Sequence, residues 1–404
     1  MSTATNTATA SSVGVVAGLG IAQTLAWAST YYLPAILAAP MAQELGVSMP
    51  TVYAAFSVGL GVSGLVGPLS GHAIDRHGGR SVLMGTSVLF ALGLTALGAS
   101  QGAWSLFAAW ALIGLAMGSG LYEAAFSALV RLYGHRSRNA MTGITLIAGF
   151  ASTVGWPLST LLETQIGWRG TCFAWAGLHL ALGLPLNAGL PRVPVAATPA
   201  PQLRVDIDGK QKTSGGSRGT TAALAFVFAT TWFISTAMAT HLPSLLQASG
   251  ASLAVAIGVG ALIGPAQVAG RLLEFSFLRH VHPLLSARLA ALGHPIGVLA
   301  LLVAGPALAP LFAVLHGAGN GILTIAKGTL PLVLFGPQGY GLRQGWLMLP
   351  ARGAQALAPF LFGLALVQWG PSALWLCAGL GVSAFLALMT LPRLQASARW
   401  PRSS

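Results

Sequence analysis

Twelve stretches of apolar and small residues, each long enough to cross a bilayer as a helix, most constrain what this chain can fold into. Spanning a hydrocarbon core takes about 20 residues of helix. Charged residues make up only 7% of the chain, against about 25% in soluble domains. The sequence therefore predicts an all-α membrane protein with spans at 13–38, 50–73, 81–99, 103–130, 140–162, 170–190, 221–246, 252–276, 286–305, 308–335, 344–367 and 371–391.

The basic residues between these stretches predict how the chain is oriented. Of the 20 Lys and Arg residues, three lie inside the stretches away from their ends, and Arg169 lies on one side of the membrane. All the others fall on the side of the N-terminus, which the positive-inside rule makes cytoplasmic. The net charge of +13 is thus explained by orientation in a membrane and not by nucleic-acid binding. We expect a multi-pass protein of a bacterial inner membrane with both termini in the cytoplasm.

A polar segment at 191–220 predicts a division into two halves. It is rich in Pro, Gly, Ser and charge and has no apolar period, as is typical of a linker. The residues that end the two halves also echo each other: Leu190-Pro191-Arg192 and Leu391-Pro392-Arg393. We expect two pseudo-symmetric six-helix bundles at 13–190 and 221–392, a cytoplasmic linker at 191–220, and cytoplasmic tails at 1–12, which is disordered, and 393–404.

Between the second and third stretches lies the charged segment Gly67–Arg80, GPLSGHAIDRHGGR. It resembles the helix 2–3 signature of the major facilitator superfamily of secondary transporters, although the family prefers Arg where Gly79 stands. The resemblance implies a twelve-helix major facilitator fold and alternating access to a mid-membrane site. It also implies a gating role, the stabilisation of one closed state, for Gly71, Asp75, Arg76, Gly78 and Arg80. The alternative is an ordinary positively charged loop of another membrane protein.

Charged residues within the spans are candidates for function because a charge in the bilayer is costly. Away from their ends, the spans hold Glu123, Arg271, Glu274, Lys327 and Arg352. From the helix rise, all except Glu274 lie about 12–14 Å from the cytoplasmic face, close to mid-bilayer. We expect one layer of three cations and one anion, with Glu274 nearer the surface and grouped with the gate. Such a layer favours an anionic substrate, because Arg and Lys bind carboxylates.

Uncharged residues on helices expected to line the cavity complete the candidate substrate site: Trp27, Tyr31, Asn320 and Gln267. An alternative has no substrate in the layer. Arg271 and Glu274 are spaced i, i+3 and can pair on one helix. Glu123 can be neutralised by Lys327 or Arg352 of the other half, so that the layer is only a latch between the halves.

Several short segments are similar to those of oxalate:formate and monocarboxylate porters: Trp27–Pro34 (WASTYYLP), Gly167-Trp168-Arg169, Gly270-Arg271 and Arg352. The resemblance implies transport of a small organic anion such as a carboxylate, by proton symport or anion exchange. The alternative is proton-coupled efflux of a drug-like or amphipathic compound, with the charge layer acting as a latch. A sensor or scaffold that keeps the fold without transport is a third hypothesis.

The sequence lacks the motifs that other functional classes require. There is no Gly-x4-Gly-Lys-Ser loop for ATP, and His, Cys and Asp show no metal-ligand spacing. The only cysteines, Cys172 and Cys377, lie in apolar runs and do not form a disulfide framework. We expect no enzymatic activity, no cofactor and no metal. The expected partners are a small solute, the lipid bilayer and a coupling proton or counter-anion, and a monomer is sufficient.

Overall fold

The computed structural model describes residues 12–133, 137–192, 218–276, 282–335 and 340–391, and within these ranges every regular element is a helix. Nine helical stretches in these ranges are long and apolar enough to cross a membrane. Three of them, Ala140–Ala188, Pro283–Lys327 and Leu347–Thr390, contain 49, 45 and 44 residues, roughly twice what one crossing needs. The all-α membrane class is confirmed. The nine stretches accommodate twelve spans, a number that stays a prediction.

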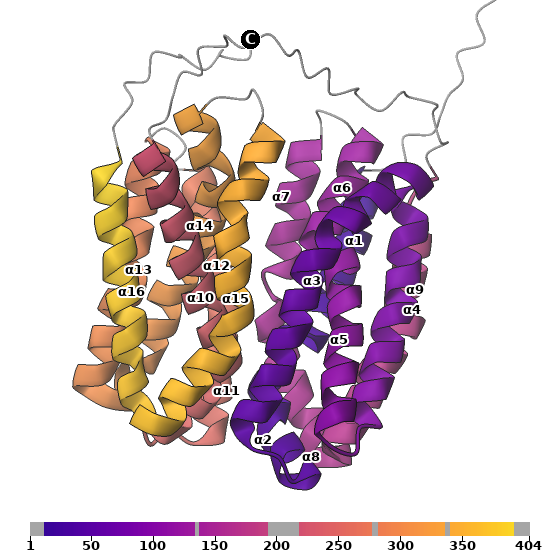
Figure 1. Ribbon diagram of the computed structural model, residues 1–404, viewed down its shortest axis with the longest axis horizontal. Helices are drawn as coiled ribbons and strands as arrows, with labels where there is room; N and C mark the ends of the chain where they lie inside the picture. Colours follow the sequence, from indigo (N-terminus) through magenta and orange to yellow (C-terminus); the bar gives the residue numbers. More distant parts are fainter. Residues whose placement is uncertain (1–11, 134–136, 193–217, 277–281, 336–339, 392–404) are drawn as a thin grey trace, which may run out of the picture.

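The helices lie in two groups side by side, residues 12–190 in one and 218–391 in the other (Figure 1). The first group contains α1 (Ser12–Ser29), α2 (Pro34–Leu45), α3 (Met49–His77), α4 (Gly79–Gly98), α5 (Ala103–Gly120), α6 (Tyr122–Tyr133), α7 (Ser137–Ala148), α8 (Ala151–Leu178), a π-helical turn (His179–Gly183) and α9 (Leu184–Ala188). The second contains α10 (Arg218–Ala248), α11 (Leu253–Ala261), α12 (Ile263–Ser276), α13 (Pro283–Ala304), α14 (Ala309–Phe335), α15 (Tyr340–Trp369) and α16 (Leu374–Thr390), with 3-10 turns at Gly305–Leu308 and Gly370–Ala373.

The predicted tails and most of the linker lie outside the described residues. Of the predicted tail 1–12, only Ser12 is described, as the first residue of α1. The tail 393–404 and the linker residues 193–217 are not described. Helix α10 begins at Arg218, so the last residues of the predicted linker are helical.

The charged segment Gly67–Arg80 is more helical than the predicted turn. Helix α3 continues through Asp75 and Arg76 to His77, and α4 starts two residues later. Gly78 alone joins the two helices, with φ of +86°. Glycine adopts a positive φ without a steric penalty because it has no Cβ. The charges of the motif are therefore part of a helix end and not of a loop.

Several predicted spans are also interrupted within their length. The first span breaks between Ser29 and Pro34, because proline lacks an N–H and its ring clashes with the carbonyl four residues earlier, that of Thr30. Other breaks separate α5 from α6, α7 from α8, and α11 from α12. Membrane proteins tolerate such interruptions only where other groups satisfy the freed backbone.

Glycines allow close packing within and between the two groups. A Cβ on Gly114 of α5 would lie 2.3 Å from the Gly59 carbonyl oxygen of α3. Between the groups, a Cβ on Gly260 of α11 would lie 2.1 Å from the Trp156 ring of α8. Small residues commonly let the backbones of membrane helices approach each other closely. Such packing matters because the hydrophobic effect does not drive helices together within lipid.

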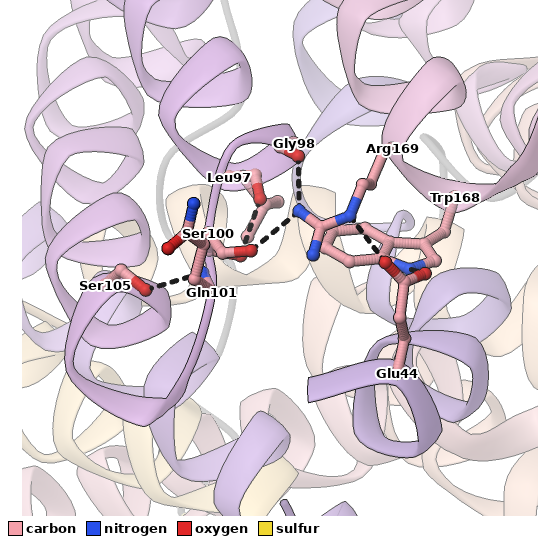
Figure 2. Close-up of polar contacts among 8 residues, drawn as sticks. All are labelled: Glu44, Leu97, Gly98, Ser100, Gln101, Ser105, Trp168 and Arg169. Carbon is pink, nitrogen blue, oxygen red and sulfur yellow. Dashed lines mark hydrogen bonds and ion pairs between the residues drawn. The ribbon is translucent and has the colours of Figure 1, made fainter. Parts of the chain in front are cut away.

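A polar network holds together the end of the first group opposite the α3–α4 turn (Figure 2). Arg169 Nε donates to Glu44 Oε1 at 2.6 Å, and Trp168 Nε1 donates to Glu44 Oε2 at 2.5 Å. Arg169 Nη1 also donates to the carbonyl oxygens of Gly98 at 2.7 Å and Ser100 at 2.6 Å. The cation predicted on the periplasmic side thus joins the end of α2, the end of α4 and the middle of α8.

The α3–α5 contact gives a first prediction. Gly114→Ala introduces a Cβ against backbone atoms, which cannot rotate away, and we expect a loss of about 1–3 kcal/mol of stability. The loss is measured as a lower apparent melting temperature of the purified protein in detergent. Gly85→Ala is the matched control, because a Cβ there meets no atom within 4 Å. Equal melting temperatures for the two variants would contradict the packing argument.

Candidate functional site

A break in the predicted fourth span positions Glu123. Leu121 has an extended backbone (φ −82°, ψ −166°), so α5 ends at Gly120 and Glu123 lies in the first turn of α6. The last carbonyls of α5 are satisfied from neighbouring helices. Gln23 Nε2 donates to the Gly120 oxygen at 2.7 Å, and Thr86 Oγ1 donates to the Ser119 oxygen at 3.1 Å. A carboxylate is stabilised at a helix N-terminus by the helix dipole.

Glu123 forms an ion pair with Arg352 of α15, which belongs to the second group of helices. Arg352 Nη1 also donates to Gln355 Oε1 at 2.9 Å. The side chains of Arg352 and Glu123 are 31% and 57% exposed, so the pair borders an open space and is not sealed between helices. Of the two partners predicted for Glu123, Arg352 forms the ion pair that the structure shows.

Arg271 of α12 makes a second contact across the two groups. It is 6% exposed, and its Nη1 donates to the carbonyl oxygen of Thr145 in the last turn of α7. A cation is favourable at a helix C-terminus, where the carbonyl dipoles point outward. In the described part of the chain, the ion pairs are Arg169–Glu44 and Arg352–Glu123. The i, i+3 pair of Arg271 with Glu274 is therefore not formed.

Lys327 of α14 lies against an aromatic ring. It is 8% exposed, and its Nζ lies 4.3 Å from the ring centroid of Trp232 in α10. Arg352 Cζ lies 5.5 Å from the centroid of the same ring. Both distances allow a cation–π attraction. Trp232 thus brings two of the three predicted cations together, a role that its sequence context does not reveal.

Aromatic residues of α1 and α6 continue this layer. The Trp27 ring lies 5.0 Å from those of Tyr31 and Tyr122, and the Tyr122 hydroxyl lies beside Arg271. The Tyr31 hydroxyl lies 2.6 Å from Thr236 Oγ1 of α10, a third contact across the two groups. The structure therefore places Trp27 and Tyr31 next to the charges.

The remaining predicted site residues lie in two different places. Gln267 of α12 is buried within reach of Tyr32, on the border between the groups. Asn320 instead lines a cavity of about 30 Å³ inside the second group, together with His294 and His316. It lies seven residues before Lys327 on α14, about two helical turns away. Glu274 is half-buried in the last turn of α12 and lies neither at the border between the groups nor in the Asn320 cavity.

The described residues contain no cluster of three or more His, Cys, Asp or Glu side chains that can hold a metal ion. The groups that meet at mid-depth are instead guanidinium, ammonium, one carboxylate, hydroxyls and aromatic rings. This set suits the reversible binding of an anion by charge and hydrogen bonds. Sequence reasoning missed Thr145 and Thr236, because a backbone carbonyl or a single threonine in an apolar helix gives no pattern.

Comparisons with known proteins agree with this architecture. A family model described as the Major Facilitator Superfamily matches residues 19–311. A crystal structure of a D-xylose-proton symporter superposes with a TM-score of 0.73 at 17% identity, covering 94% of this chain and 98% of that chain. For the nucleoside transporter NupG the TM-score is 0.72 at 14% identity, with 93% and 99% covered. A search of curated proteins gives no match. At these identities the two structures show the fold alone.

The ion pair at the site gives a second prediction. Glu123→Gln and Arg352→Gln each remove the same interaction, so we expect their effects on stability to be less than additive in the double variant. Because both side chains are partly exposed, the coupling should be modest, roughly 0.2–1 kcal/mol. It is measured from unfolding of the wild type, both single variants and the double variant. Full additivity would show that the pair does not couple the two groups.

Proposed function

The chain belongs to the major facilitator superfamily, and on this premise we propose that it is a secondary transporter of a small organic anion such as a carboxylate. The transported solute binds at mid-depth between the two groups of helices. The observation that carries the proposal is the excess of positive charge there. Arg271, Lys327 and Arg352 meet with Glu123 as the carboxylate of the layer. An anion entering from solution compensates this excess, which otherwise remains costly within a bilayer.

The present partners of the two arginines suggest how the anion binds. Arg352 contacts the Glu123 carboxylate and Arg271 contacts a backbone carbonyl, so each guanidinium already binds an oxygen. A substrate carboxylate offers the same acceptor geometry and competes for both. Tyr31, Trp27 and Trp232 supply the aromatic wall around this position. Substrate binding thereby exchanges contacts between the halves for contacts with the solute.

Alternating access follows from contacts that a rocking motion can break. The Tyr53 ring near the start of α3 lies 4.2 Å from His241 of α10, and the Trp156 ring of α8 packs against Gly260 of α11, where a Cβ would lie 2.1 Å from the ring. Such contacts, together with the mid-depth layer, close the end opposite the α3–α4 turn. The exposed fractions of Glu123 and Arg352 support a state open towards that turn, on the predicted cytoplasmic side.

The location, oligomeric state, coupling and gate in this proposal are taken from the sequence-based predictions. We propose an inner-membrane location with cytoplasmic termini, a monomer as the working unit, and coupling by proton symport or anion exchange. One structural neighbour is a proton symporter, which supports proton coupling, and the solutes in both neighbours' names, xylose and nucleosides, are uncharged. Gly71, Asp75, Arg76, Gly78 and Arg80 act as the gate, and Glu274 is assigned to the same end of the molecule.

A second candidate function is proton-coupled efflux of a drug-like or amphipathic compound. It is favoured by the fact that Arg271 and Arg352 are both engaged by the other half. In this case the charge layer is a latch that opens when Glu123 is protonated. The compound then binds the aromatic residues and leaves the arginines free of substrate contact.

A binding experiment separates the two candidates. The purified protein is heated in detergent with formate, oxalate or lactate, and separately with tetraphenylphosphonium, a lipophilic cation. We expect a carboxylate to raise the melting temperature of the wild type. Arg271→Gln and Arg352→Gln each remove a charge-assisted hydrogen bond, so we expect affinity to fall about tenfold or more.

The matched control is Arg192→Gln, which removes an exposed cation far from the layer and should keep carboxylate binding at the wild-type level. Stabilisation by carboxylates that persists in both site variants would refute the anion site. Stabilisation by tetraphenylphosphonium alone would support efflux instead.

The gating motif gives a separate prediction. Asp75→Asn keeps the size of the side chain and removes its charge from the end of α3. If the motif stabilises one closed state, we expect transport into proteoliposomes to slow about tenfold or more, which corresponds to about 1.4 kcal/mol. Substrate affinity, measured by thermal shift, should change little because Asp75 is remote from the layer. An unchanged transport rate would rule out the gating role.

A further inference from the structure

A small cavity lies inside the first group of helices, beside the break between α5 and α6. Its volume is about 10 Å³, which is about what one water molecule needs. Its wall is supplied by elements that are distant in sequence: α1, α4, the end of α5, the π-helical turn and α9. The polar side chains on this wall belong to Gln23, Thr86, Ser87, His179 and Asn187. The proposed transport cycle makes no use of a binding site here.

Two buried side-chain amides on this wall are hydrogen-bonded through their nitrogens only. Gln23 is 2% exposed, and its Nε2 donates to the Gly120 carbonyl oxygen at 2.7 Å. Asn187 is 7% exposed, and its Nδ2 donates to Ser87 Oγ at 2.9 Å and to the Leu83 carbonyl oxygen at 3.3 Å. Within the described part of the chain, Gln23 Oε1 and Asn187 Oδ1 are buried without a hydrogen-bond partner. A buried acceptor without a partner pays its full desolvation penalty, so both oxygens call for a donor.

The bonds of the two nitrogens show that the atoms left open are oxygens. An amide can be turned by half a rotation, which exchanges its oxygen with its nitrogen. In Gln23 this would set the side-chain oxygen against the Gly120 carbonyl oxygen. In Asn187 it would set the side-chain oxygen against the Leu83 carbonyl oxygen. Two acceptors cannot bond to each other, so both open atoms are acceptors and a ligand must bring them two donors or a positive charge.

A water molecule matches this requirement without adding charge. It brings two O–H donors, one for each amide oxygen, and Ser87 Oγ on the same wall offers a third polar contact. A sodium ion would instead carry a charge into the bilayer, which is costly. Glu123, the carboxylate of the layer, is already paired with Arg352. We propose that this cavity binds one ordered water molecule, which donates to Gln23 Oε1 and to Asn187 Oδ1.

The bound water supports the break between α5 and α6. By holding Gln23 Oε1, it keeps Nε2 of the same amide directed at the Gly120 carbonyl, the last carbonyl of α5. That carbonyl must find a donor because α5 does not continue. The water also joins α1 to α9 through Asn187. It thereby stabilises the helix end after which Glu123 lies in the first turn of α6.

The first test is a density map of the full-length wild-type protein, at a resolution that shows ordered water elsewhere in the protein. We expect one peak at about 2.5–3.0 Å from both Gln23 Oε1 and Asn187 Oδ1. Melting temperatures in sodium chloride and in choline chloride of equal concentration should agree. A map without this peak would overturn the proposal. A melting temperature that sodium alone raises, and that it no longer raises in Gln23→Met, would overturn it in favour of a bound cation.

The second test measures whether the two amides share a partner. Gln23→Met and Asn187→Leu each remove one acceptor of the same water, and the hydrogen bonds that the structure shows for the two amides go to different groups. We expect the melting temperature of the double variant to fall by less than the sum of the two single falls, with a shortfall of about 2 °C or more.

The matched control combines Gln23→Met with Thr171→Val. Thr171 is buried in α8, its Oγ1 donates to the Gly167 oxygen at 2.8 Å, and it does not line the cavity. The falls in melting temperature should add in this pair, because no water links the two sites. Equally additive falls for Gln23→Met and Asn187→Leu would overturn the proposal.

Discussion

Backbone carbonyls left open by broken helices are the constraint on which the centre of this protein depends. Inside a bilayer no water is available to satisfy them, so a helix can break only where another group donates a hydrogen bond. Gln23 and Thr86 do this for the end of α5, and Thr153 Oγ1 of α8 donates to the Ala261 oxygen at the end of α11. These donors come from neighbouring helices, so each break is also a point of tertiary contact.

The same breaks organise the charges. The end of α5 places Glu123 at a helix N-terminus, and the end of α7 presents the Thr145 carbonyl to Arg271. Both positions are electrostatically favourable because the helix dipole has its positive end at the N-terminus and its negative end at the C-terminus. Charged side chains and helix ends therefore stabilise one another across the two groups. Interactions of this kind are exchanged at modest cost, as rocking of the halves around a transported solute requires.

Sequence reasoning identified the class of fold and the residues that carry charge into the membrane. The apolar stretches, the distribution of Lys and Arg, and the motif at Gly67–Arg80 were sufficient for a membrane protein of the major facilitator superfamily. Spacing along single helices also placed Arg271, Lys327 and Arg352 at one depth. Sequence reasoning failed at helix ends: α3 continues to His77, and the predicted first span breaks before Pro34. Packing between helices overrides local turn preferences at such positions.

The sequence by itself thus determined which residues are apolar and which are charged, and it predicted how deep each charge lies, because hydropathy and the helix rise act along one helix at a time. Only the tertiary structure decided the partners: Arg352 with Glu123, Arg271 with the Thr145 carbonyl, and Lys327 with Trp232. It also placed Asn320 in a separate cavity. The physical reason is that a pairing between helices depends on their rotation and crossing, and these are set by close contacts such as that of Gly260 with Trp156.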